Sequence, residues 1–476
     1  MRRMTVITCI ATLGVGLATY ATLDAYDRVP GILTIDPDPS AVPVPAPVTG
    51  SPVARVPVPS PTTPSPTAAP LPSGAGIRAA LGARLTDPRL GEVSLTVRDG
   101  MTGAHLLDVA ADTPRTPAST TKLLTAAAVV PSLGPDTRLA TSTLLAPDGT
   151  LVLKAGGDTL LGRGASRPDA VEGHAGVATL AADTARALRA AGRTAVTLRL
   201  DSSYAAGPDY APGWPRSFFE EAIVGKVTTL GLADGLVAPG RPGPTDPAEE
   251  VAQVLRDALR KDGITVTGDL ARGTAPVPGA TPLAAVTSAT VADQMAVALQ
   301  RSDNALAESL ARQATARAGA VPAGRPVGFG DAAAWVQAEL ARRGYDTSGV
   351  RLADSSGLAA GTTVPARVVG DVVTAGTTGR EPALARVVQD LPVAGLSGTL
   401  GGRYVSGPAL PGAGVVRAKT GTLTGVSSLG GTVVDRDGRT LAFALIANEV
   451  PAATGTEGGR AALDALVARL AGCGCR

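Results

Sequence analysis

Apolar and polar positions follow two distinct periods in the first globular part of the chain. Residues 77–85 have the apolar spacing of a helix, whereas residues 93–97 and 105–109 alternate like the two strands of a hairpin. The run from Ser119 to Val130 is rich in Leu and Ala and is followed by Pro131. We expect this run to form a buried helix that Pro131 ends, with Ser119 in its first turn.

The C-terminal part of the chain returns to strand patterns. Residues 415–422 and 426–434 are expected to be adjacent strands, and the tight-turn signal Asp437-Gly438 leads into a third run, 440–447. An amphipathic helix is expected over residues 457–470. With the N-terminal hairpin, these runs predict an α/β (α+β) fold, in which helices pack on an antiparallel sheet whose strands come from both ends of the chain.

The long middle segment mixes strand-like and helical runs, and we expect it to form an inserted second domain. The division would be 139–282 for the inserted domain and 76–138 with 283–470 for its host. Trp214 and Trp335, the two tryptophans of the chain, are expected to be packing anchors. The supporting runs are 151–154 and 196–200 as strands and 177–191 and 247–261 as helices.

The N-terminal region is expected to lie outside the folded domains. Residues 1–28 begin with a basic stretch and an apolar run, so we expect a signal peptide or a membrane anchor and an extracytoplasmic protein, either secreted or membrane-anchored. Residues 29–75 form a Pro-rich linker, because 13 of the 39 prolines fall between residues 37 and 73. Such a segment favours an extended polyproline II conformation and cannot bury a core.

The last residues, 471–476, are expected to be an unstructured tail without a catalytic role. They contain Cys473 and Cys475, whose spacing would strain a disulfide between them, so free thiols or an intermolecular bond are expected instead.

Composition argues against metal and nucleic-acid chemistry. His105 and His174 are the only histidines, they lie far apart, and there is no C-x-x-C pair, so we expect no metal site and no cofactor. The net charge is +2 and the charged residues are well mixed, which gives no indication of a nucleic-acid partner.

Three short motifs occur in order along the chain: Ser119-Thr120-Thr121-Lys122, Ser302-Asp303-Asn304 and Lys419-Thr420-Gly421. The chain has only five lysines and two asparagines, so this ordered set is rare by chance. The motifs supply a nucleophile, proton carriers and an anchor for a carboxylate without a histidine. This set is typical of serine acyl-transfer enzymes that use a lysine base.

The catalytic residues are expected to be Ser119, Lys122 and Ser302. Ser119 and Lys122 lie one helical turn apart, so the lysine amine can accept the serine hydroxyl proton. A lysine with its ordinary pKa near 10.4 is almost fully charged at pH 7, so burial and a second cation must lower the pKa of Lys122. We expect Lys419 to be that cation and to stay charged, while Ser302 relays a proton to the leaving amine.

Backbone and side-chain donors are expected to complete the site. The N–H groups of Ser119 and Thr422 would form the oxyanion hole. Asn304 would bond to Lys122 and to the amide of the substrate.

A carboxylate-binding site is expected on the third motif. Lys419 and the hydroxyls of Thr420 and Thr422 would hold the negative group, while Gly421 leaves room for a close approach. A substrate that ends in a free carboxylate is implied.

Longer phrases around these motifs resemble the low-molecular-mass penicillin-binding proteins of class C type, the D-alanyl-D-alanine carboxypeptidases and endopeptidases. The similarity runs from about residue 76 to 470. The phrases are PASTTK at 117–122, SDNALAE at 302–308, DSSGL at 354–358, LPVAG at 391–395 and AKTGT at 418–422.

The resemblance implies a β-lactamase/transpeptidase-like domain with a five-stranded antiparallel sheet, interrupted by the inserted domain. It implies removal of the terminal D-Ala from peptidoglycan stem peptides, or cleavage of cross-bridges, at a bacterial cell envelope through an acyl-enzyme on Ser119. β-Lactam antibiotics would acylate the same serine. Two departures leave the choice of substrate open: the insertion is shorter than in larger members, and Ser397 stands where the family often has an acidic residue.

Two alternatives stay open. A β-lactamase would share the nucleophile, but the chain lacks the E-x-x-L-N segment of the class A type and the Tyr-x-Asn motif of the class C type. A non-catalytic wall-binding protein of the same fold would be expected to lose motif side chains, and all of them are intact here.

Overall fold

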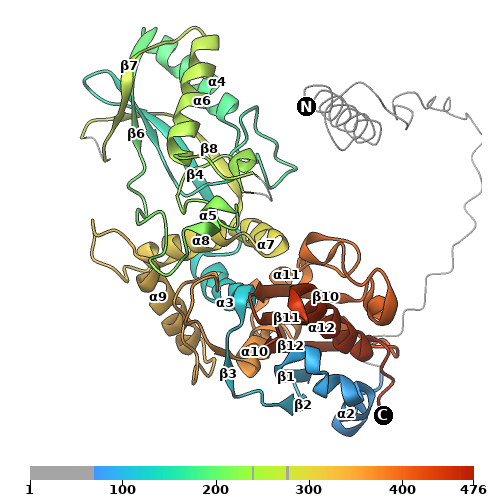
Figure 1. The fold of residues 1–476 in the computed structure, drawn as a ribbon. Coiled ribbons are helices and arrows are strands. Elements are labelled where there is room, and N and C mark those ends of the chain that lie inside the picture. Colours follow the sequence, from blue (N-terminus) through green and yellow to red (C-terminus); the bar gives the residue numbers. More distant parts are fainter. Residues whose placement is uncertain (1–68, 238–240, 275–277) are drawn as a thin grey trace, which may run out of the picture. The chain divides into compact units, whose positions relative to one another are not determined.

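We describe the fold from a computed structural model, which describes residues 69–237, 241–274 and 278–476. Two five-stranded sheets organise this part of the chain, and helices pack against each of them (Figure 1). The expected signal or anchor at 1–28 lies outside the described residues, as does nearly all of the linker. Among the helices that are described, none is long and apolar enough to cross a membrane.

The first sheet combines strands from both ends of the chain. Its order is β10-β11-β12-β1-β2, and every neighbouring pair is antiparallel, which confirms the predicted five-stranded antiparallel sheet. The strands are β1 (Glu92–Asp99), β2 (His105–Val109), β10 (Val416–Leu423), β11 (Val426–Val434) and β12 (Thr440–Asn448).

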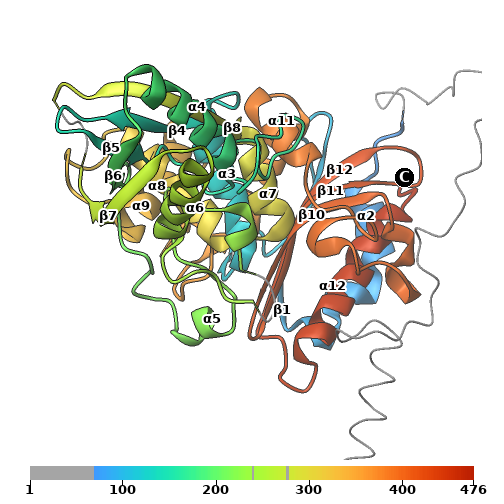
Figure 2. The ribbon, with the colours of Figure 1, turned by 90° about the horizontal axis from the view of Figure 1, so that it is seen from above.

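Helices cover both faces of this sheet. On one side lie α2 (Gly74–Leu81) and α12 (Gly455–Ala471), and on the other lies α3 (Thr121–Leu133) (Figure 2). Helix α10 (Ala366–Thr377) shares the core of α3. The central strand β12 is therefore buried along most of its length, which explains its unbroken apolar run.

Alternate residues of β12 face two different cores. Leu441, Phe443 and Leu445 pack with α2 and α12. Ala442 and Ala444 face the side of α3 and α10. Because these side chains are small, the helices on that face can pack close to the sheet, and one of them is the helix that follows Ser119.

The second sheet is built from the middle of the chain. Its order is β7-β6-β5-β4-β8, with parallel β5–β6 and β6–β7 pairs and antiparallel pairs elsewhere. Helices α4 (Val177–Ala190) and α6 (Pro247–Lys261) share its hydrophobic core. The strands are β4 (Arg138–Leu145), β5 (Thr150–Lys154), β6 (Ala195–Asp201), β7 (Thr265–Arg272) and β8 (Thr281–Thr290).

Further helices complete the described part of the chain. Helix α5 (Ser217–Glu220) lies between β6 and β7 in sequence, and the segment between β8 and β10 contains α7 (Val291–Arg301), α8 (Asn304–Arg317), α9 (Phe329–Arg342) and α11 (Pro382–Gln389). A two-residue pairing joins β3 (Pro114–Arg115) to β9 (Val364–Pro365). Four of these helices, α7, α8, α9 and α11, contribute buried residues to the same core as α3.

The expectation that Pro131 ends the first buried helix is wrong. Helix α3 continues through Pro131 to Leu133, and Gly134 N–H closes its last turn on the carbonyl of Val130 at 3.1 Å. Proline removes one backbone donor, but this close to the C-terminus the loss does not prevent one more turn.

The C-terminal tail is ordered, contrary to the expectation from sequence. Cys473 and Cys475 are buried and form a disulfide with each other, although strain was expected to prevent this pairing. The carbonyl of Cys475 accepts a 2.6 Å bond from the N–H of Ser73, and Arg436 N–H donates to the carbonyl of Cys473. These backbone bonds hold the tail against the start of α2, which a local reading of Gly-Cys-Gly-Cys-Arg cannot reveal.

Candidate active site

Ser119 lies in a short 3₁₀ turn, Ala118–Thr120, that leads directly into α3. Ala118 has φ +48°, an uncommon conformation for a residue with a side chain. Ser428 of β11 fixes the beginning of this turn, because its Oγ donates to the carbonyl of Pro117 at 2.6 Å. The sheet therefore positions the serine at the start of a buried helix, close to where the sequence predicts it.

Lys122 is fully buried and its Nζ has three partners. Nζ lies 2.9 Å from Ser119 Oγ, 2.6 Å from Asn304 Oδ1 and 2.9 Å from the carbonyl oxygen of Ser356. The last two partners can only accept, so they take two N–H groups, whereas a serine hydroxyl can also donate. A neutral amine would thus direct its lone pair at the Ser119 hydroxyl, as a general base requires.

Burial lowers the pKa of Lys122 from 10.5 to about 8, against the opposing influence of nearby Asp354, Glu308 and Asp303. At this pKa roughly one molecule in ten has a neutral amine at pH 7, far more than for an exposed lysine. Burial is the main cause, whereas a second cation was expected to share in the effect.

Lys419 is also fully buried, and its Nζ donates to Ser302 Oγ at 2.9 Å and to the carbonyl of Thr420 at 2.6 Å. Burial, together with the charges of Lys122 and Arg403, holds the pKa of Lys419 well below its usual range. Both influences act against the positive charge that we expect on Lys419. An incoming carboxylate would raise the pKa of Lys419 again, because an opposite charge favours the charged form.

The Ser302-Asp303-Asn304 motif joins two helices beside the nucleophile. Ser302 ends α7 with φ +58°, and Asn304 begins α8. The Asn304 amide donates to the carbonyl of Ile223 at 3.1 Å, which orients its oxygen toward Lys122. The motif thus places Ser302 in contact with Lys419 and Asn304 in contact with Lys122.

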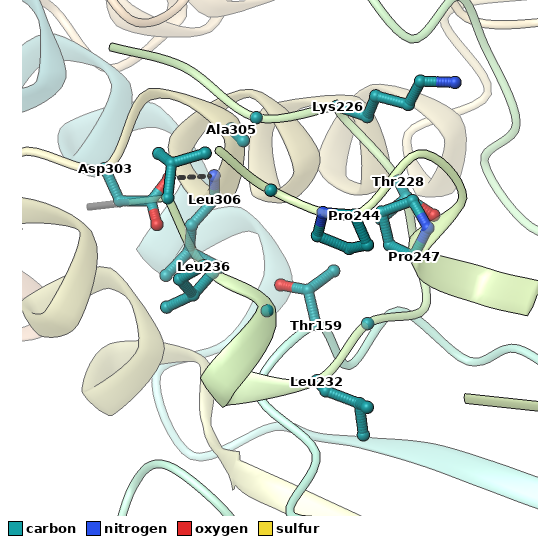
Figure 3. A pocket seen from close by; sticks show the side chains of 15 residues that line it. Thr159, Lys226, Thr228, Leu232, Leu236, Pro244, Pro247, Asp303, Ala305 and Leu306 are labelled. Atoms are coloured by element: carbon teal, nitrogen blue, oxygen red, sulfur yellow. Dashed lines mark hydrogen bonds between the residues drawn. The ribbon is translucent and has the colours of Figure 1, made fainter. Parts of the chain in front are cut away.

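Asp303 has a structural contact of its own. Its carboxylate caps α8 through the N–H of Leu306 at 2.9 Å, and it lines a separate pocket with Thr159, Leu232 and Pro244 (Figure 3). That pocket encloses only about 40 Å³, enough for a few water molecules at most. A peptide substrate cannot enter it.

The third motif lies on the edge strand β10. A side chain at Gly421 would put its Cβ 2.5 Å from the carbonyl oxygen of Pro117 and 3.1 Å from Ser119 N, so only glycine lets the strand approach the serine turn this closely. Thr420 Oγ1 bonds to Thr399 Oγ1 at 2.9 Å. The predicted motif residues are therefore brought together from three distant parts of the chain.

A cleft of about 830 Å³ connects these groups. Its lining combines Ser119, Ser302, Asn304, Thr420 and Thr422 with residues contributed by the middle segment, namely Phe218, Glu221 and Ile223, and with Arg301, Arg403 and Arg460. The space is large enough for a peptide, and no group of His, Cys, Asp or Glu in the described residues could hold a metal ion.

Sequence reasoning assigned no role to a buried carboxylate that supports the site. Asp354 accepts from the N–H groups of Gly357 and Ala359 at 2.6 and 2.7 Å, from Ser356 Oγ at 3.1 Å and from Trp214 Nε1 at 2.8 Å. These bonds fix the turn whose Ser356 carbonyl holds Lys122.

Glu308 is a second buried acid without an assigned role. It accepts from the N–H of Ser355 at 2.8 Å, and burial together with the neighbouring Asp354 raises its pKa to about 8. The signal that could have revealed Glu308 is its position one turn after Asn304 on the same helix.

Comparison with known proteins gives a consistent result over nearly the whole described chain. The family model "D-Ala-D-Ala carboxypeptidase 3 (S13) family" matches residues 77–239 and 243–471. The carboxypeptidase DacB of Mycolicibacterium smegmatis is 36% identical, with 97% of both chains covered. A Mycobacterium tuberculosis carboxypeptidase is 35% identical, with 85% of both chains covered.

Among solved structures, penicillin-binding protein 4 from Haemophilus influenzae has a similar fold. The TM-score is 0.64 at 20% sequence identity, and the match covers 84% of this chain and 98% of the other. At this identity the likeness concerns the fold alone.

Proposed function

Since the chain belongs to the D-Ala-D-Ala carboxypeptidase 3 (S13) family, we propose that its activity as a serine-type D-Ala-D-Ala carboxypeptidase proceeds through an acyl-enzyme on Ser119. The observation that carries the proposal is the 2.9 Å contact between Ser119 Oγ and the buried Nζ of Lys122. The pKa of Lys122 is lowered, and two fixed acceptors take the N–H groups of the neutral amine. Its lone pair therefore points toward the Ser119 hydroxyl.

Acylation would begin with transfer of the Ser119 proton to neutral Lys122. Oγ then attacks the carbonyl carbon of the penultimate D-Ala, and the carbonyl π electrons move to oxygen. When this intermediate collapses, the carbonyl re-forms and the bond to the nitrogen of the terminal D-Ala breaks. That nitrogen takes, by way of Ser302, the proton that Lys122 received from Ser119, and Ser302 itself contacts Lys419. In the second half, water gives a proton to the again neutral Lys122 and attacks the ester carbon, the bond to Oγ breaks, and Oγ takes the proton from Lys122, which releases the shortened peptide and regenerates Ser119.

The oxyanion would bond to the N–H groups of Ser119 and Thr422. The N–H of Ala418 donates to Pro392 across the edge of β10 that faces away from β11, and Val416 accepts a bond from Ala394 at the same edge. Backbone groups on a strand alternate between its two edges, so the N–H of Thr422 should point to this outer edge as well. This alternation supports Thr422 as the second donor.

The terminal carboxylate of the substrate would bind to Lys419, Thr420 and Thr422. Gly421 allows strand β10 to pack close to Ser119. Asn304 would bond to the substrate amide while it holds Lys122. All of these groups except Lys419 and Gly421 line the cleft, and Lys419 reaches it through Ser302.

The family acts on peptidoglycan, so we propose stem peptides ending in D-Ala-D-Ala as substrates and β-lactams as acylating inhibitors. Cleavage of D-Ala-linked cross-bridges is the second activity that the same cleft supports, because its open form and its middle-segment wall would admit a branched peptide. The rate of D-Ala release and the rate at which cross-linked muropeptide dimers are cleaved to monomers, measured in parallel, would give the ratio of the carboxypeptidase to the endopeptidase activity.

Action outside the cytoplasm agrees with this substrate. We propose that residues 1–28 export the chain, as a cleaved signal or as a membrane anchor, and that residues 29–75 are a spacer. We also propose residues 139–282 as an inserted domain, to which Arg138 and the rest of strand β8 up to Thr290 belong as parts of the same sheet. Its contribution to the site includes Phe218, Glu221 and Ile223.

The proposal is tested with labelled penicillin and with diacyl-Lys-D-Ala-D-Ala, comparing the wild type with Ser119→Ala. We expect a stable covalent label and released D-Ala in the wild type, and neither in the variant. Covalent labelling of the protein followed by rapid hydrolysis of the penicillin would favour a β-lactamase. Absence of label and of D-Ala in the wild type would favour a non-catalytic wall-binding protein.

A further inference from the structure

We propose that Arg460 is a substrate-binding residue that holds the terminal carboxylate of the acyl donor together with Thr422. The inference rests on the proposed function and adds a guanidinium from helix α12 to the carboxylate site, outside the three sequence motifs.

Arg460 is placed at the carboxylate site by its contact with the last residue of that site. It lines the same cleft as Ser119, and its Nε donates to Thr422 Oγ1 at 3.3 Å. A hydroxyl has one hydrogen and two lone pairs. When the guanidinium occupies a lone pair of Thr422, the hydroxyl hydrogen remains for a carboxylate in the cleft. The same guanidinium has further N–H groups that can bond to the second carboxylate oxygen.

A cation whose charge does not depend on Lys419 would strengthen the carboxylate site. Lys419 is buried beside Lys122, and both burial and this neighbour favour its neutral form. Arginine remains protonated at every accessible pH, and its planar fork matches the two oxygens of a carboxylate. Arg460 would therefore attract the carboxylate first, and the bound carboxylate would then favour protonation of Lys419.

Three arginines line the cleft, and their acidic partners distinguish them. Arg403 makes two bonds to Asp464, whose side chain is 6% exposed, and Arg301 pairs with Glu172, which is 28% exposed. Arg460 pairs with Glu457, which is 83% exposed. A solvated partner of this kind is held weakly and can be exchanged for a substrate carboxylate at small cost.

The experiment compares two peptides that differ only at the C-terminal carboxylate. One is diacyl-Lys-D-Ala-D-Ala, and the other is the same peptide ending in D-alaninamide, which has no carboxylate. The variants are Arg460→Gln and Arg460→Lys, with Arg469→Gln as a control, because Arg469 is an exposed arginine of the same helix that bonds to the carbonyl of Ala80.

We expect Arg460→Gln to lower kcat/KM for the acid by about 10- to 100-fold, mainly through KM, which is the range for a lost charged hydrogen bond. For the amide the change should stay below about threefold. Arg460→Lys should lie between Gln and the wild type on the acid, since it keeps the charge without the fork. Arg469→Gln should match the wild type on both peptides.

Equal losses on both peptides, or no loss on the acid, would overturn the inference while leaving the proposed function in place. Failure of the proposed function would show itself differently, because the wild type would then release no D-Ala. Thermal unfolding of each variant accompanies the kinetics, and if Arg460→Gln does not fold, the acid-to-amide ratio of Arg460→Lys decides the question.

Discussion

At the residue scale, two fully buried lysines lie behind the residues that line one cleft but have different electrostatic neighbours. Lys122 lies near Asp354, Glu308 and Asp303, which partly offset the burial that lowers its pKa. The charged neighbours of Lys419 are both cations. The pKa of Lys122 therefore lies near the range in which the amine can accept a proton, whereas the surroundings of Lys419 disfavour its charge and a bound anion would favour it.

Substitution by arginine should separate these two roles. Lys122→Arg should abolish acylation by penicillin, because a guanidinium cannot lose its proton and cannot serve as a base. Lys419→Arg should retain part of the activity, since its role requires a positive charge and hydrogen-bond donors. The measurement is the second-order rate of covalent labelling. Measurable labelling of Lys122→Arg at a rate near the wild type would contradict the base assignment.

The pH dependence should reveal Lys122 directly. Acylation needs the neutral amine, and burial places the pKa of Lys122 at about 8, so the rate should rise roughly tenfold per pH unit below that value and level off above it. A peptide ending in D-alaninamide is the appropriate substrate, because its binding does not depend on the charge of Lys419. With a carboxylate substrate a second, falling limb should appear as Lys419 loses its proton. A flat profile for the amide between pH 6 and 8 would rule this mechanism out.

At the scale of elements, the site depends on how closely edge strand β10 approaches the turn before α3. Gly421 would place a Cβ 2.2 Å from Ser428 Oγ, the same hydroxyl that fixes Pro117 at the start of that turn. Strand β10, the serine turn and strand β11 can therefore pack together only because Gly421 has no side chain.

Gly421→Ala should reduce acylation at least about 100-fold, because the added methyl group must push β10 away from Ser119 or displace the Ser428 bond. The expected loss of stability is about 1–3 kcal/mol. Gly402→Ala is the matched control, since Gly402 lines the same cleft and its added Cβ would meet no atom within 4 Å. Similar rates for both variants would show that the close approach is not needed.

Local signals predicted many of these elements well. The bounds of β11 and α6 agree with the sequence prediction, and for α6 the reason is visible, because Asp246 caps the helix and Pro247 begins it. The prediction at Pro131 was wrong because a proline this close to the end of a helix removes only one backbone bond, and most of α3 is held by burial. The disulfide between Cys473 and Cys475 was missed for a related reason, since burial of the tail is decided by residues far along the chain.

At the scale of the whole molecule, the middle segment contributes to the catalytic machinery through Trp214. Its indole N–H bonds to Asp354, 140 residues later, and Asp354 orders the turn that holds Lys122. The motifs predicted which side chains form the site, but the role of Asp354 could not be predicted, because its partner Trp214 is distant in sequence and only the fold brings the two together.

Trp214→Phe should weaken this support. Loss of the bond to a buried carboxylate should cost about 1.5–3 kcal/mol of stability and slow acylation severalfold, because the Ser356 carbonyl is less well fixed. Trp335→Phe is the control, since Trp335 packs in the core around α9 and has no contact with Asp354 among the bonds described above. We expect the control to lower the melting temperature without changing the rate of labelling. Equal rates for the two variants would argue against the coupling.

The adjacency of β1 and β12 has a consequence for the order in which the polypeptide becomes structured. Asp99, at the end of β1, pairs with Arg439, which is made 340 residues later. The catalytic sheet therefore cannot close until almost the entire chain has been synthesised, and such long-range pairings are slow to form. A chain that stays open this long suits the export that we propose for it, and the site proposed around Ser119 is complete only after the last strands of the sheet have formed.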